Sequence, residues 1–327
     1  MATATQIKSL LQSHGSRDDE RFYAVALQVA AAEARQGHEK LAKEIRDLVE
    51  QSRKKAAVGK SGATVLSLSS PQGEAADLLE TVSRDIKVRD LVLDPGLRER
   101  IDRILKEQQN LSRLKENGLR PRQRLLFTGP PGCGKTMTAS ALASELGLAL
   151  FVVRLDSLIS RYLGDSLSKL RLIFDAAERT RAVYLFDEFD SIGCSRDASG
   201  EVAEMRRLLN SFLVFIEKMR GNSLIIAATN HGGKLDKALF RRFDDLVEFG
   251  LPGEEQIRMT IQTLLAGVNV ATLSWKRLLP TAEGLSFSEI TRACEESIKQ
   301  KLIENRKAVT SDMLLAALTE RRLFLNH

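Results

Sequence analysis

The sequence predicts an α/β fold, in which a five-stranded parallel sheet is sandwiched by helices between an N-terminal helical hairpin and a small C-terminal helical lid. Short apolar runs alternate with helical stretches from residue 124 onward, as parallel strands buried on both faces do. These runs are Arg124–Thr128, Leu148–Val153, Ala182–Phe186, Leu224–Ala228 and Leu246–Phe249. After residue 252 only helical patterns remain, and that stretch of about 75 residues is long enough for a small helical domain.

The first 75 residues are predicted to form a hairpin and a linker. Apolar side chains recur at helical spacing on both sides of Gly37, which predicts a helical hairpin over residues 1–57. A hairpin of this size has a small core, so we expect it to pack on something, either as a structural appendage or as a docking element for a partner. Residues 58–75 are rich in serine and glycine, which indicates a linker.

Residues 76–252 are predicted to form the large α/β domain, and residues 253–327 the lid. A helical pattern with Leu97, Ile101 and Ile104 on its apolar face leads into the large domain. The basic residues of this stretch alternate with acids, which favours a solvated helix face over a nucleic-acid site.

Composition excludes several classes of protein. Hydrophobic residues make up 43% of the chain and charged residues 28%, as in ordinary globular proteins and unlike disordered or collagenous chains. No apolar run approaches the ~18 residues that span a bilayer, and no secretion signal is evident. Three cysteines, an odd number, predict reduced thiols and a cytoplasmic location. A net charge of +6 permits an acidic partner without requiring nucleic acid.

A phosphate-binding loop is the strongest local motif. It has the pattern G-x-x-x-x-G-K-[ST] between a predicted strand and a predicted helix. Its residues are Gly129, Pro130, Pro131, Gly132, Cys133, Gly134, Lys135 and Thr136, and Met137 completes the predicted nucleotide contacts. Glycines let consecutive N–H groups surround phosphates, and the helix adds its positive end. Lys135 is expected to reach the β- and γ-phosphates, and the Thr136 hydroxyl to bind Mg²⁺.

Two acids follow the third apolar run. Asp187 and Glu188 end the sequence Ala182-Val183-Tyr184-Leu185-Phe186-Asp187-Glu188, and acids at the rim of a buried sheet are a poor choice for structure alone. Asp187 is predicted to hold Mg²⁺ through water. Glu188 is predicted to polarise the attacking water.

Four motifs in this order and spacing resemble the AAA+ ATPases, and most closely the AAA group proper, which includes katanin, spastin, the proteasomal ATPases and the FtsH proteases. The motifs are GPPGCGKT, LFDEFD, IIAATN and ALFRRFD. The resemblance implies a five-stranded parallel sheet, a helical lid, ATP and Mg²⁺ as ligands, and hexameric rings. It also implies ATP-driven remodelling or unfolding of protein substrates.

Further site residues are implied by the resemblance. Asn230 matches the sensor that orients water against the γ-phosphate. Arg241 and Arg242 match the arginine fingers that reach the ATP of the next subunit. The family usually separates these arginines by two residues, whereas here they are adjacent. Neighbouring residues point in different directions, so one of the two is expected to serve, and the sequence does not select it.

Substrate contacts are implied by a second set of matches. Arg161, Tyr162 and Leu163 resemble the first pore loop, whose aromatic ring grips a passing polypeptide, although Tyr162 as a half-buried loop anchor is the alternative. In the lid, Ser288 stands where many other AAA+ clades place an arginine, which favours the AAA group proper. The segment Leu91-Val92-Leu93 occupies the place of the adenine-side loop.

The partners predicted from these features are further copies of the chain, a protein substrate, and a separate protease or adaptor. None of the four histidines has the spacing that a zinc protease needs, so no protease is predicted in the chain. No membrane partner is expected. The alternative function is a nucleic-acid-associated AAA+ ATPase, such as a helicase loader or transposition regulator. A degenerate ATPase acting as a scaffold is disfavoured, because the catalytic positions are intact.

Overall fold

The computed structural model describes residues 73–83, 85–158, 163–190, 200–234 and 237–325, together with the helical positions Ala30 and Lys43. The predicted hairpin, most of the predicted linker and the pore-loop residues Arg161 and Tyr162 lie outside the described residues. The chain divides into two compact units, Met1–Ser67 and Leu68–His327, and the second is described below. Among the described residues, no helix has the length and apolar character needed to cross a membrane.

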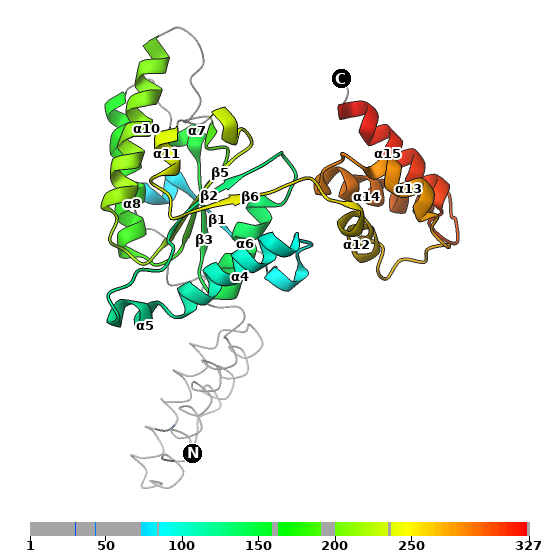
Figure 1. The fold of residues 1–327 in the computed structure, drawn as a ribbon, viewed down its shortest axis with the longest axis horizontal. Coiled ribbons are helices and arrows are strands. Elements are labelled where there is room, and N and C mark those ends of the chain that lie inside the picture. Colours follow the sequence, from blue (N-terminus) through cyan, green and yellow to red (C-terminus); the bar gives the residue numbers. More distant parts are fainter. Residues whose placement is uncertain are drawn as a thin grey trace. The chain divides into compact units, whose positions relative to one another are not determined.

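A six-stranded sheet forms the centre of the large domain (Figure 1). Its strand order is β1-β3-β4-β5-β2-β6. The strands are β1 (Leu79–Val82), β2 (Arg124–Thr128), β3 (Leu150–Val153), β4 (Val183–Phe186), β5 (Leu224–Thr229) and β6 (Asp245–Glu248). Strands β2 to β6 are mutually parallel, so the predicted five-stranded parallel sheet is confirmed.

Strand β1 is the addition that the sequence does not predict. It pairs antiparallel with β3 at the sheet margin, from Leu79 opposite Val153 to Val82 opposite Leu150. The short 3₁₀ helix η2 (Gly73–Leu78) precedes it. Only the first of the four β1 residues is buried, so the strand has no apolar run that would distinguish it from a loop.

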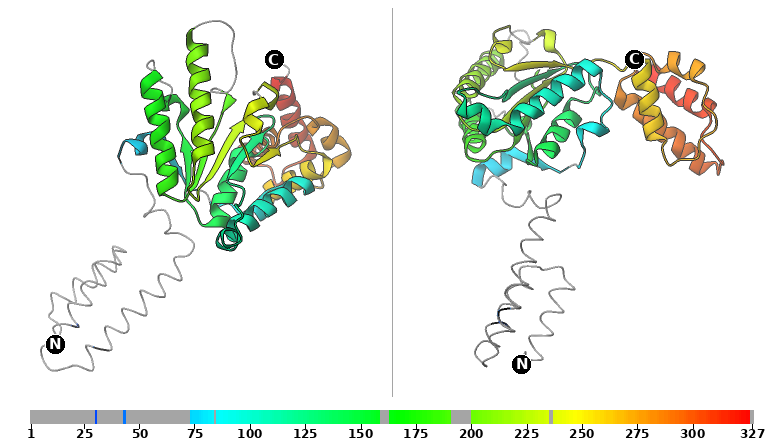
Figure 2. Two further views of the ribbon diagram at one scale, coloured as in Figure 1. Left: turned by 60° about the vertical axis from the view of Figure 1, so that its left-hand side comes forward. Right: turned by 60° about the horizontal axis from the view of Figure 1, so that its bottom comes forward.

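Helices cover both faces of the sheet (Figures 1 and 2). One layer consists of α4 (Pro95–Gln109) and α6 (Lys135–Leu146), which share a core with β2 and β4. The other contains α8 (Leu163–Arg179) and α10 (Gly200–Lys218). The other helices of this domain among the described residues are η3 (Val88–Asp90), α5 (Leu111–Glu116), α7 (Leu155–Leu158), η4 (Gly232–Lys234) and α11 (Lys237–Phe240).

Successive side chains of β4 point to opposite faces of the sheet, and each face has its own hydrophobic core. Leu185 belongs to the cluster on the α4–α6 face. Phe186 faces the other way, where its ring lies 5.0 Å from Phe212 of α10 and 5.9 Å from Phe174 of α8. Phe189 also contacts Phe212, at 4.7 Å between ring centroids. Because Phe186 and Phe189 both pack against Phe212, the two residues between them are held at the end of the strand.

The C-terminal helices form a cluster with its own core. They are α12 (Glu254–Leu264), α13 (Trp275–Ala282), α14 (Phe287–Ile303) and α15 (Ser311–Leu325). Ile261, Leu278, Ile290 and Leu314 are fully buried among them. The hydroxyl of Ser286 caps α14 by accepting a hydrogen bond from the Glu289 N–H, which begins the helix after Gly284 and Leu285. The domain boundaries given above stay predictions.

Candidate active site

The phosphate loop lies at the carboxyl edge of the sheet, the edge at which the parallel strands end. Strand β2 ends at Thr128, and α6 begins at Lys135. Gly129 and Gly132 have positive φ angles of 143° and 75°, which glycine alone adopts readily. A Cβ added at Gly129 would lie 2.0 Å from the Phe249 carbonyl oxygen. The Gly129 backbone therefore packs against Phe249, the residue after β6, more closely than any side chain would allow.

Lys135 is brought to Asn230 across this edge. Its Nζ donates to Asn230 Oδ1 at 2.8 Å and to the carbonyl oxygens of Gly129 and Pro130 at 2.6 and 2.9 Å. The side chain is buried, and burial lowers the pKa of its amine, against the opposing attraction of Cys133, Asp187 and Asp190. The lysine is thus aimed at the loop interior and held in one position.

Thr136 and Asp187 meet between α6 and β4. The Thr136 hydroxyl donates to Asp187 Oδ2 at 2.6 Å. A hydroxyl and a carboxylate are the hard oxygen ligands that Mg²⁺ takes, with the other positions filled by water and substrate phosphates. No group of three or more His, Cys, Asp or Glu side chains that could hold a metal occurs among the described residues. The pair fits a cation whose remaining ligands are water and the phosphates of a bound molecule.

Glu188 has an unusual backbone conformation. Its φ is +51°, a left-handed value that costs a non-glycine residue of order 1–3 kcal/mol and recurs at functional sites. Its N–H donates to Asp187 Oδ1 at 2.9 Å, and the next N–H, of Phe189, donates to the Ala228 carbonyl at 2.8 Å. The Glu188 side chain is exposed, and so it is accessible to a water molecule at the edge.

Asp190 is a site residue that the sequence analysis missed. Its Oδ1 accepts hydrogen bonds from the Thr229 hydroxyl at 3.1 Å and from the Asn230 N–H at 3.3 Å. This carboxylate ties the end of β5 to the segment after β4, and thereby positions Asn230. The signal available in the sequence was an acid three residues after Asp187, beyond a buried phenylalanine.

A cavity of about 530 Å³ adjoins the loop, within the usual size of a small-molecule site. Val92, Leu93 and Leu97 supply apolar lining from the segment ahead of and within α4, and Phe249 supplies it after β6. Polar groups are few: Asp94, Arg100, Glu248 and Gln256. The predicted adenine-side segment therefore contributes Val92 and Leu93 to the lining of this cavity.

Cys133 lies in the loop and lines the same cavity. Its side chain is buried, and burial raises the pKa of its thiol in spite of the nearby Lys135. The lid reaches this part of the loop, because the Ser288 N–H donates to the Gly132 carbonyl at 3.1 Å. A Cβ at Gly132 would lie 2.6 Å from the Ser286 hydroxyl. Pro131 and Met137 are exposed beside these residues.

The two predicted arginines lie elsewhere, at the amino edge of the sheet, where the parallel strands begin. Asp245, three residues after Arg242, is in register with Leu125 near the start of β2. A five-residue strand spans roughly 16 Å, so the structure does not bring Arg241 or Arg242 to Lys135 of the same chain. Arg242 forms an ion pair with Glu217 of α10. Arg241 is exposed and has no polar partner within the described part of the chain.

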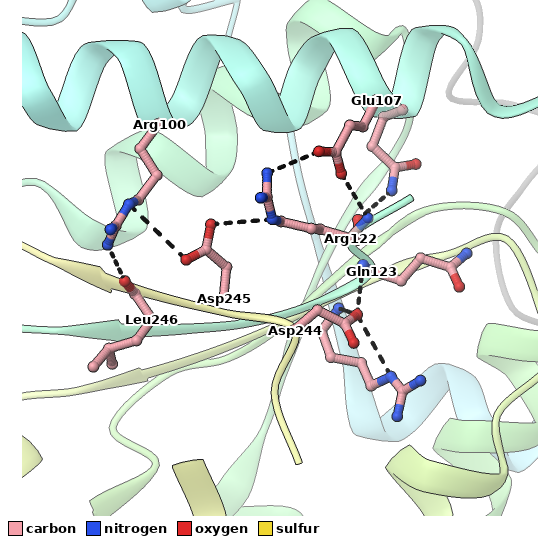
Figure 3. A network of polar contacts seen from close by, with 9 residues as sticks. Arg100, Glu107, Arg122, Gln123, Asp244, Asp245 and Leu246 are labelled. Carbon is pink, nitrogen blue, oxygen red and sulfur yellow. Dashed lines mark hydrogen bonds and ion pairs between the residues drawn. The ribbon is translucent and has the colours of Figure 1, made fainter. Parts of the chain in front are cut away.

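The segment after the arginines is anchored by carboxylates (Figure 3). Asp244 Oδ2 accepts hydrogen bonds from the N–H groups of Gln123 and Arg124, both at 2.9 Å. Asp245 lies 3.4 Å from the Arg122 guanidinium, which also pairs with Glu107 of α4 at 2.8 Å. The start of β6 is thereby fixed to the start of β2 and to α4.

This combination of a parallel α/β sheet and a phosphate loop ahead of a helix defines the class of P-loop nucleotide-binding proteins. The chain belongs to the AAA family, the ATPase family associated with various cellular activities. The family match covers residues 125–251. An uncharacterized AAA family ATPase of Sinorhizobium fredii, y4kL, is 38% identical over 94% of this chain and 92% of its own length.

Other relatives share only part of their length with this chain. The proteasome-activating nucleotidase of Methanoregula boonei is 30% identical over 71% of this chain and 54% of its own. Spastin of Drosophila persimilis is 35% identical over 57% of this chain and 25% of its own. The chain thus spans about half of the one and a quarter of the other. The AAA domain of FIGL-1 has the same fold, with a TM-score of 0.60 at 23% identity over 74% of this chain and 85% of that domain.

Proposed function

We propose that this chain is an ATP-hydrolysing motor that remodels or unfolds protein substrates as a hexameric ring. The proposal rests on one observation: the polar side chains of the predicted site lie in two groups at opposite edges of the sheet. Lys135, Asp187 and Asn230 converge at the carboxyl edge of the sheet, whereas the two arginines lie at the amino edge. A site built from both edges needs two copies of the chain.

The proposed chemistry at the carboxyl edge is ATP hydrolysis. Lys135 holds the β- and γ-phosphates, with the loop N–H groups around them. Thr136 and Asp187 hold Mg²⁺, which when bound neutralises charge between the phosphates. Glu188 polarises the attacking water as general base, and Asn230, held by Lys135 and Asp190, orients that water. The base of the nucleotide occupies the cavity lined by Val92, Leu93 and Phe249.

The second copy supplies the missing charge. An amino edge that meets the carboxyl edge of the next copy makes a head-to-tail contact, and such contacts close into rings. Positive charge delivered in trans to a transferring phosphoryl group is a large catalytic effect. The hexamer itself is supported by the resemblance to the AAA group proper.

A protein substrate is favoured over nucleic acid. The relatives include a proteasome-activating nucleotidase and spastin. Four of the basic residues in the 97–124 stretch bind their own chain: Arg98 donates to Val88, Arg100 and Arg122 pair with Asp245, and Lys115 donates to Asn222. Tyr162 and its neighbours Arg161 and Leu163 are the proposed substrate grip. A separate protease or adaptor and a cytoplasmic setting complete the proposal.

The test of the shared site mixes two inactive proteins. A variant without both arginines (Arg241→Ala, Arg242→Ala) and a Glu188→Gln variant are each expected to bind ATP and to hydrolyse almost none. Mixed before assembly, they should recover part of the wild-type ATPase, because some interfaces combine one intact half from each. Full ATPase activity in isolated monomers, or no recovery in mixed rings of confirmed composition, would refute the shared site.

The test of the motor function measures substrate binding by Tyr162 separately from ATP hydrolysis. Tyr162→Ala should retain assembly and ATPase within a few-fold, yet lose disassembly or unfolding of a substrate co-purified with Glu188→Gln. Tyr162→Phe should keep this work, because a packing contact needs the ring and not the hydroxyl. If Tyr162→Ala processes substrate normally, the grip is elsewhere. Salt-dependent DNA binding with a steep slope would favour the nucleic-acid alternative.

A further inference from the structure

The adjacency of Arg241 and Arg242 leaves open which of them serves a neighbouring subunit. The structure distinguishes the two side chains. Arg242 forms an ion pair with Glu217, near the end of α10, and the two side chains are 43% and 38% exposed. Arg241 is exposed and has no polar partner within the described residues.

The backbone around the arginines limits how far they can exchange places. The Arg242 N–H donates to the Leu239 carbonyl at 2.9 Å, and the Asp244 N–H donates to the Arg124 carbonyl at 2.7 Å. Phe243, between these two anchors, is buried. A shift that turned Arg242 to the position of Arg241 would have to break this turn and expose the phenylalanine.

We propose that Glu217 is a positioning residue that retains Arg242 and so leaves Arg241 as the arginine presented to the nucleotide of the next subunit. The inference rests on the proposed function. Its physical basis is charge. To reach a phosphate, Arg242 would have to give up its ion pair with Glu217 and leave that carboxylate unpaired near a second anion. Arg241 can move to a phosphate without any such cost.

A suppression experiment tests whether Glu217 keeps Arg242 from replacing Arg241. It compares variants that assemble into rings as the wild type does. Arg241→Ala should reduce ATP hydrolysis on the order of 10³-fold with nucleotide binding intact. Adding Glu217→Ala to Arg241→Ala should restore activity about tenfold, because the released Arg242 reaches the phosphate with imperfect geometry. A third change, Arg242→Ala, should abolish the restored activity.

Two matched variants control for charge and for helix stability. Glu116→Ala in the Arg241→Ala background removes an equal charge from an exposed glutamate of α5 and should restore nothing. Glu217→Asp keeps the carboxylate and should restore less than Glu217→Ala. This rescue pattern would not arise if Glu217 only stabilised the fold.

The failure modes are distinguishable. If Glu217→Ala does not raise the activity of Arg241→Ala in rings that bind nucleotide normally, the positioning role is wrong. A larger loss for Arg242→Ala than for Arg241→Ala would also overturn it, because the assignment would be reversed. If both single variants and their double variant stay fully active, the shared site itself is wrong, and the proposed function fails with the inference.

Discussion

The polar side chains at the two edges of the sheet differ in how they are held. At the carboxyl edge the polar side chains form two hydrogen-bonded pairs, Lys135 with Asn230 at 2.8 Å and Thr136 with Asp187 at 2.6 Å, so each group is oriented by its partner. At the amino edge, carboxylates fix the backbone on one side of the arginines (Figure 3), while Arg241 is unpaired among the described residues. One edge is a preorganised site, and the other is an anchored segment that presents an exposed charge.

The largest expected effect breaks the chemistry at the carboxyl edge alone. Glu188→Gln should lower ATP hydrolysis by about 10²–10⁴-fold, as loss of a general base does. Binding of Mg²⁺ and ATP should persist, because Lys135, Thr136 and Asp187 are unchanged. Single-turnover hydrolysis beside nucleotide binding checks this. Near-normal turnover would remove Glu188 from the mechanism.

A smaller effect is expected from Asp190, which holds Asn230 in place at the carboxyl edge. Asp190→Ala should lower hydrolysis by roughly 10–100-fold, because Asn230 loses its anchor and small misplacements of catalytic groups are costly. Asp190→Asn keeps an acceptor oxygen and should stay within a few-fold of the wild type. The comparison is kcat for the two variants at saturating ATP. Equal rates for both would mean that Asp190 does not position Asn230.

The corresponding change at the amino edge should affect stability. Asp244→Ala leaves the N–H groups of Gln123 and Arg124 without their acceptor, which should lower the free energy of unfolding by about 1–3 kcal/mol. Asp156→Ala is the control, since its carboxylate is 75% exposed and lies 3.7 Å from Arg154, and surface pairs contribute roughly 0–1 kcal/mol. Urea unfolding measures both. Equal losses would show that the Asp244 anchor is not special.

The smallest effect concerns the thiol beside the phosphates. The pKa of Cys133 is raised by burial, so at neutral pH its reactive thiolate is scarcer than in an exposed cysteine. Alkylation should be slower in the folded protein than in the chain unfolded in urea, and should accelerate as the pH rises. Cys133→Thr should be active and should identify the labelled site. Rapid alkylation with loss of ATPase at neutral pH would contradict this expectation.

The parts of this structure that sequence could predict are those with local signals. The five parallel strands have apolar runs, and the phosphate loop has glycines at fixed spacing. Strand β1 has neither, because Glu80 and Thr81 are exposed. The role of Asp190 depends on a contact between the residues that follow β4 and β5. The ion pair of Arg242 depends on a contact between α10 and the segment after α11. The spacing of residues in the sequence does not reveal either contact.

Strand β1 also determines where a shortened fragment of this domain can begin. Without it, β3 would become the outer strand of the sheet, with the buried residues Leu150, Phe151 and Val153 beside a row of open backbone N–H and C=O groups. Such margins recruit strands from other molecules and lead to aggregation. With β1 in place, the margin is a four-residue strand bearing a glutamate and a threonine. A fragment beginning before Gly73 should therefore remain in solution, whereas one beginning after Val82 should self-associate through its sheet.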